Sequence, residues 1–193
     1  FQSQTKALEI LYLLNNLKPI VRFGFLPQEL PKIEAFCKEN NLFIQKSPFK
    51  VTLTDTSKFS NEGKVTDASN PNSLFLVYIS KDQRYALLTC LYEAQGDHYL
   101  VGKRLGYPDC CCTFFVEEFK KGNLNPMHKP TNPWTNITLR EKDIVLISHF
   151  PCSSECKESI AIAKKNYELI KSIEPHHIEE MLRELSKEIQ QNI

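Results

Sequence analysis

Five of the seven cysteines of this 193-residue chain fall in two short segments, Cys110–Cys112 and His149–Cys156. The first follows a Gly-Tyr-Pro-Asp turn, and the second reads His-Phe-Pro-Cys-Ser-Ser-Glu-Cys. Thiolates are soft metal ligands and also nucleophiles. The spacing matches neither the paired C-x2-C of zinc ribbons nor the C-x2-C runs of ferredoxins. Zinc and an iron–sulfur cluster therefore both remain open as cofactors.

Both segments are expected to open helices. Asp109 has the residue type of an N-cap for a helix over residues 110–121, and Ser153 or Ser154 is a suitable cap for a long helix reaching residue 172. Free N–H groups and the positive end of the dipole stabilise anions at such helix starts. A thiol there is expected to have its pKa lowered toward 7 or below.

Helix geometry limits which cysteines share one site. Successive residues point about 100° apart, so Cys110, Cys111 and Cys112 cannot all face one point. Cys110 and Cys111 are preferred because they are nearest the helix start. His149 is a candidate catalytic residue for proton transfer, or a fifth ligand. The predicted metal ligands are Cys110, Cys111, Cys152 and Cys156.

Simple core packing is the alternative for each cysteine, because free cysteine is among the most buried residue types. Cys156 begins an apolar stripe on its helix and fits this alternative. Cys37 and Cys90 lie on apolar helix faces with no accompanying motif, and for them core packing is preferred.

The two segments together resemble an uncharacterised, largely archaeal family known only as a domain of unknown function. Its pattern is G-Y-P-x-C-C followed by H-x-P-C-S-x-x-C, and the resemblance covers about residues 97–172. The resemblance implies a site built from Cys110, Cys111, His149, Cys152 and Cys156. Cys112 lies outside the pattern. The family implies no particular reaction.

Composition limits the classes of protein to which this chain can belong. The net charge of +1 gives no reason to expect a nucleic-acid partner, and no apolar run is long enough to span a membrane. No secretory leader opens the chain, so we expect a cytoplasmic protein with reduced cysteines. Its expected partner is an unidentified small molecule or protein, and its expected state is a monomer or weak homodimer.

The pattern of apolar residues predicts an α+β fold, a helix-rich single domain with a small sheet. Residues 1–72 are expected to form a supporting lobe, and residues 73–193 the cysteine-site part. Residues 54–73 are expected to form a long hairpin loop or a mobile segment, and residues 123–138 an irregular connection. Helices are predicted over residues 5–16, 27–40, 82–94, 98–105, 110–121, 153–172 and 175–190, and strands over 43–54, 74–79 and 143–148. For residues 85–92 a strand is the alternative to the helix.

Three functional classes follow from these residues. The first is a metal protein, with sulfur transfer, desulfuration or redox chemistry if it is an enzyme. The second is a metal-free thiol/disulfide protein in which Cys152 or Cys110 attacks. The third is a structural metal module that displays a binding surface. Separately, the apolar stripe of the last helix is expected to dock on its own domain, with self-association as the alternative.

Overall fold

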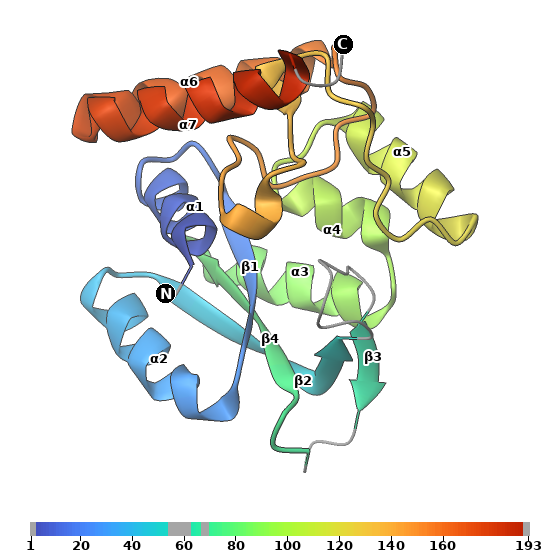
Figure 1. Ribbon diagram of the computed structural model, residues 1–193. Helices are drawn as coiled ribbons and strands as arrows, with labels where there is room; N and C mark the ends of the chain where they lie inside the picture. The colour runs from blue at the N-terminus through green and yellow to red at the C-terminus, as the bar shows by residue number, and fades with distance from the viewer. Residues whose placement is uncertain (1–2, 54–62, 67–69, 191–193) are drawn as a thin grey trace. The chain divides into compact units, whose positions relative to one another are not determined.

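A computed structural model describes residues 3–53, 63–66 and 70–190 (Figure 1). These residues form seven α-helices and one four-stranded antiparallel sheet, which confirms the predicted α+β class. The chain divides into two compact units, residues 18–106 and residues 1–17 with 107–193. The boundary predicted near residue 72 falls within the first of these, and the single-domain organisation stays a prediction. None of the described helices combines the length and apolar character that crossing a membrane requires.

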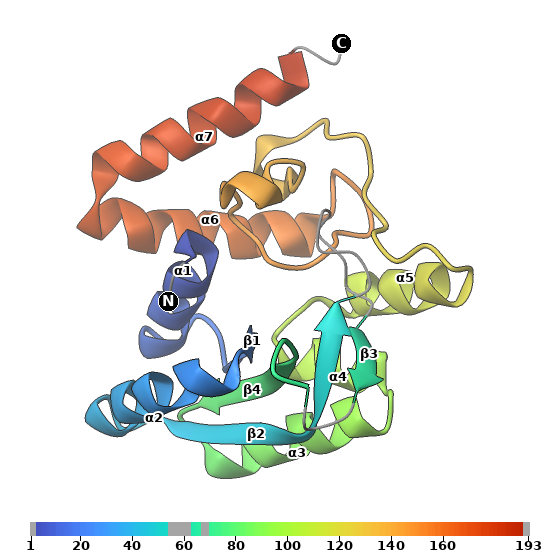
Figure 2. The same cartoon turned by 60° about the horizontal axis from the view of Figure 1, so that its bottom comes forward.

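The unit of residues 18–106 contains the sheet, with strand order β1-β4-β2-β3. Val77, Tyr78 and Ile79 of the inner strand β4 are completely buried. Helix α3 packs on β2 and β4, as Figure 2 shows. The elements are β1 (Ile20–Phe25), η1 (Pro27–Glu29), α2 (Leu30–Glu39), β2 (Phe43–Leu53), β3 (Gly63–Thr66), β4 (Leu74–Ser80), α3 (Gln83–Ala94) and α4 (His98–Arg104).

Strands β2 and β4 confirm the prediction, whereas β1 and β3 were not predicted. β1 is short and contains Gly24, which weakens the strand pattern. β3 lies in the polar stretch expected to form a hairpin loop, and it pairs only with β2. Residues 54–62 and 67–69 of that stretch lie outside the described residues, so the expectation of a loop is not tested there.

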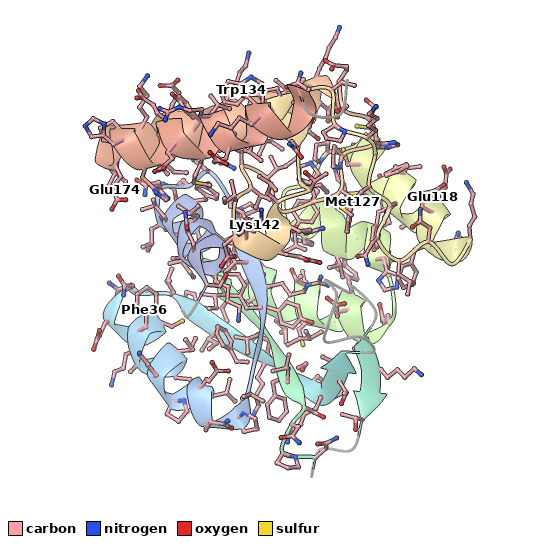
Figure 3. All side chains as sticks on the ribbon, in the orientation of Figure 1. Phe36, Glu118, Met127, Trp134, Lys142 and Glu174 are labelled. Carbon is pink, nitrogen blue, oxygen red and sulfur yellow. The ribbon has the colours of Figure 1, made fainter. Side chains whose placement is uncertain are left out.

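The unit that carries both cysteine segments is built from helices around one apolar core. Trp134, labelled in Figure 3, meets the ring of Tyr167 on α6 edge-on, with 5.3 Å between ring centroids. The elements of this unit are α1 (Gln4–Leu14), α5 (Asp109–Lys120), η2 (Pro133–Thr135), η3 (Arg140–Lys142), α6 (Lys157–Ile173) and α7 (Pro175–Gln190).

Helix α7 turns back along α6 after Glu174 and has the predicted bounds (Figure 2). Ile178, Met181 and Leu185 of its apolar stripe are buried in the same cluster as Ile170 of α6. The stripe therefore docks on its own chain, as the first interpretation predicted.

The strand predicted over residues 143–148 is wrong. Val145, Leu146 and Ile147 are buried, but this segment is irregular and joins no sheet. The amide of Asn166 donates a 2.9 Å hydrogen bond to the carbonyl of Leu146. A side chain of α6 thus satisfies a backbone group that a neighbouring strand would otherwise pair.

Asp143 joins the N-terminal helix α1 to the rest of this unit. Its carboxylate accepts hydrogen bonds from the Ser3 hydroxyl at 2.8 Å and the Gln4 backbone N–H at 3.1 Å. Burial alone would raise the pKa of Asp143, but these hydrogen bonds and those from Thr5 outweigh it and lower the pKa. A residue far along the chain therefore supplements Ser3 as a cap for the first turn of α1.

Candidate metal centre

The sulfur atoms of the four predicted ligands meet in one cluster. The Sγ atoms of Cys110, Cys111, Cys152 and Cys156 all lie within 4.8 Å of one another. Cys156 Sγ is 3.7 Å from Cys110 Sγ and 3.7 Å from Cys111 Sγ. The sulfurs of Cys110 and Cys111 are 3.9 Å apart. The two cysteine segments thus meet in the structure, and four cysteines grouped in this way could hold a metal ion.

The first turn of α5 presents Cys110 and Cys111. The N-cap is Pro108 rather than the predicted Asp109, which is the first helical residue. The Pro108 carbonyl accepts from the backbone N–H of Cys111 at 3.0 Å and of Cys112 at 2.9 Å, so the turn closes one residue earlier than expected.

The helix then separates the three neighbouring cysteines as predicted. Cys110 is exposed and Cys111 is buried, and both contribute a sulfur to the cluster. Cys112 is buried elsewhere, with its Sγ 3.8 Å from the carbonyl of Tyr107. The 100° step of the helix thus leaves Cys112 outside the centre.

The second segment delivers its sulfurs from a turn and from a helix cap. Cys152 lies before α6, and its backbone N–H donates to Cys111 Sγ at 3.3 Å. Cys156 is itself the N-cap of α6, so the predicted caps Ser153 and Ser154 are wrong. The Ser154 hydroxyl instead accepts from the backbone N–H of Thr131 at 2.8 Å.

A buried serine connects the cluster to His149. The Ser159 hydroxyl lies 3.2 Å from Cys111 Sγ and donates to Cys156 Sγ at 3.3 Å. On its other side it lies 2.8 Å from His149 Nε2. His149 is 5% exposed, and its ring lies 4.9 Å from the ring of Tyr107. His149 is not one of the four grouped ligands, and its assignment as a fifth ligand or a proton-transfer group stays a prediction.

The protein environment shifts the thiol pKa values in opposite directions. Burial raises the pKa of Cys111, although hydrogen bonds from Ser159 and from the Cys152 backbone favour its thiolate. Burial and contacts with Cys110 and Cys156 raise the pKa of Cys152 to about 12. For Cys156, burial is outweighed by hydrogen bonds from Ser159, Cys110 and Cys111, and the pKa falls to about 7. The expected lowering of the pKa toward 7 therefore agrees with the direction for Cys156 and disagrees with the direction for Cys111 and Cys152.

Ser159 is the site residue that sequence reasoning missed. It follows Cys156 by one helical turn on α6, a spacing that places the two side chains on the same face. This spacing from Cys156 could have indicated Ser159 in the sequence, but serine is too common on helices for such a spacing to be specific. Cys37 and Cys90 are 1% and 5% exposed, which confirms their assignment to the core.

These features define an α+β protein with a four-cysteine cluster at the adjoining starts of two helices. Residues 86–189, more than half of the chain, match the family described as "Protein of unknown function (DUF483)", and the chain belongs to that family. The match contains both cysteine segments and confirms the predicted resemblance to a domain of unknown function. The archaeal origin and the sequence signature stay predictions. Comparisons with curated proteins and with solved structures found no match.

Proposed function

We propose that the four cysteines bind a single zinc ion and that this centre stabilises the surrounding fold. The spacing of the sulfur atoms carries the proposal. A tetrahedral zinc site with Zn–S bonds of about 2.3 Å has sulfur–sulfur edges of about 3.8 Å. Three of the sulfur pairs are 3.7, 3.7 and 3.9 Å apart, close to that edge length.

The same spacing favours one ion over an iron–sulfur cluster. In an iron–sulfur cluster at least two of the four cysteines bind different irons that are bridged by sulfides, so the sulfurs on different irons stand farther apart than two ligands of one ion. Here all four sulfurs lie within 4.8 Å of one another. A single iron ion has the same geometric requirement as zinc, and metal analysis separates the two.

Four protein ligands also favour a structural centre. Catalytic zinc sites usually keep one position for water or substrate, whereas structural sites are closed by four residues. Sulfur transfer or desulfuration needs a thiolate or metal position free to react, which a closed centre supplies less readily. The ion would join the start of α5 to the turn before α6, which are distant in sequence. Binding would then contribute directly to folding stability.

A metal-free thiol/disulfide protein is the second candidate, and one observation favours it. The lowered pKa of Cys156, about 7, gives it a substantial thiolate fraction at neutral pH. Cys110 Sγ is 3.7 Å away, and Cys110 is an exposed residue. The pair has the components of a dithiol that cycles between reduced and oxidised forms.

Metal analysis of the full chain purified under anaerobic conditions, together with its absorption spectrum, tests the proposal. We expect a colourless protein with one zinc ion per chain, and loss of zinc in the variant Cys152→Ser. The matched control is Cys112→Ser, which changes the neighbouring cysteine outside the centre and is expected to retain zinc. A brown protein containing iron and sulfide would overturn the proposal in favour of a cluster. A metal-free protein would favour the dithiol.

The cytoplasmic location and the partners remain expectations from the sequence.

A further inference from the structure

The four sulfurs of the cluster have unequal surroundings. Cys111 is buried and accepts a hydrogen bond from the Cys152 backbone N–H, with the Ser159 hydroxyl 3.2 Å away. Cys156 is also buried and accepts from the Ser159 hydroxyl. Cys110 alone of the four is exposed, and its hydrogen-bond contacts among the described residues are with the other three cysteines of the cluster.

These differences bear on reactivity. A metal-bound thiol is deprotonated, and four thiolates around one dication leave a net charge of −2 at the centre. A hydrogen bond donated to a thiolate stabilises its charge and occupies a lone pair that would otherwise attack. Burial additionally excludes a reagent. Hydrogen bonding and burial therefore both protect Cys111 and Cys156, and neither protects Cys110.

We infer that Cys110 is the reactive ligand of the centre and the site at which soft carbon electrophiles alkylate this protein. The inference rests on the proposed zinc centre. Cys110 Sγ attacks the electrophilic carbon, and an S–C bond forms while the bond from carbon to the leaving group breaks. The leaving group departs as an anion with the electron pair. No proton is transferred and no oxidant is required, because the sulfur is already a thiolate.

The product has a predictable effect on the metal. A thioether is a neutral and weaker ligand than a thiolate, so alkylation of Cys110 reduces the charge of the centre from −2 to −1 and weakens the hold on zinc. Cys152 is the nearest competitor for the reagent because it is half-buried and not fully enclosed. Cys152 is nevertheless more buried than Cys110.

The test treats the zinc-loaded full chain with limiting iodoacetamide and maps modified cysteines by mass spectrometry at successive times. Cys110 is expected to react at least about tenfold faster than Cys111 or Cys156, a ratio that corresponds to about 1.4 kcal/mol in activation free energy. Buried Cys37 and Cys90 serve as internal controls, because their modification reports unfolding. Zinc release, followed with a colorimetric chelator, is expected to track Cys110 modification.

Two variants sharpen the result. Cys110→Ser is expected to abolish the fast phase of alkylation, and Cys112→Ser is expected to retain it. If Cys110→Ser does not bind zinc, the order in which the cysteines of the chain without substitutions are alkylated still tests the inference. The inference is overturned if Cys152 is alkylated first or if all four cysteines react at equal rates. In either case the zinc measured in the protein would still support the proposed function. Absence of zinc from the purified protein overturns both.

Discussion

The hydroxyl of Ser159 lies 3.2 Å from the sulfur of Cys111. The same hydroxyl donates to Cys156 Sγ at 3.3 Å and lies 2.8 Å from His149 Nε2. If His149 Nε2 carries the proton, it donates to the serine oxygen and leaves the serine hydrogen for a sulfur. In that tautomer the single hydroxyl hydrogen of Ser159 points at the centre, and His149 acts on the thiolates through Ser159.

Replacing Ser159 with alanine is expected to weaken zinc binding by about 10- to 100-fold, the usual effect of removing a group that orients metal ligands. Competition with a chromophoric chelator measures the affinity. Ser172→Ala is the matched control, because Ser172 lies on the same helix and is exposed. Equal affinities for the two variants would show that the Ser159 hydroxyl does not support the ligands.

His149→Ala distinguishes an orienting histidine from a fifth ligand. We expect the variant to bind zinc more weakly but with unchanged stoichiometry, because His149 contacts Ser159 and is not one of the four grouped ligands. In cobalt-substituted protein the thiolate charge-transfer bands should keep their positions. His176→Ala, at an exposed position on α7, is the control. A changed cobalt ligand set in His149→Ala alone would establish His149 as a ligand.

The stability of the metal-free protein should pass through a maximum with pH. An unfolded thiol has a pKa of about 8.5. The raised pKa of Cys152, about 12, gives stability that is present below pH 8.5 and lost as pH rises toward 12. The lowered pKa of Cys156, about 7, gives stability that is present above pH 8.5 and lost as pH falls through 7.

Denaturant unfolding across this pH range, with a chelator present, measures the effect. Cys152→Ser is expected to show a shallower alkaline decline than the unmodified sequence, because it lacks one of the buried thiols that must ionise. Parallel alkaline curves for the two proteins would contradict the assignment of this loss to Cys152.

Leu185→Ala should destabilise the unit of residues 1–17 and 107–193 by about 2–5 kcal/mol, the range for removing a buried leucine side chain. Leu185 is 0% exposed and belongs to the core cluster that contains Tyr12 and Ile170. Ile173→Ala is the control, because Ile173 is 53% exposed at the end of α6. Urea unfolding at constant metal content measures both. Similar losses in the two variants would mean that α7 is not held by its apolar stripe.

Much of the helical structure was predictable because helix signals are local. The bounds of α7 follow from Pro175 and a regular apolar period, and α3 follows from Asp82, whose side chain accepts from two N–H groups of the first turn. The 100° helical step likewise explains why Cys110 and Cys111 belong to the site and Cys112 does not. These features depend on residues within one or two turns of each other.

The predictions that were wrong and the elements that were missed concern features that depend on residues distant in the sequence. Val145, Leu146 and Ile147 are buried although their segment has no strand partner, and the Asn166 amide donates to the Leu146 carbonyl. The composition of the segment therefore resembles that of a strand. β3 exists because β2 pairs with it, although its own segment is polar. The periodicity of apolar residues within each segment predicts neither the irregular structure of 143–148 nor the strand β3.

By itself, the sequence determined which cysteines were available and that each group lies at or beside a helix start. Only the tertiary structure decided that the two groups meet within 4.8 Å, and that Ser159 connects them to His149. The structure likewise decided that burial raises the pKa of Cys152 while hydrogen bonds lower that of Cys156. The physical reason is that ligand geometry and desolvation depend on three-dimensional neighbours, whereas helix starts depend on neighbours in sequence.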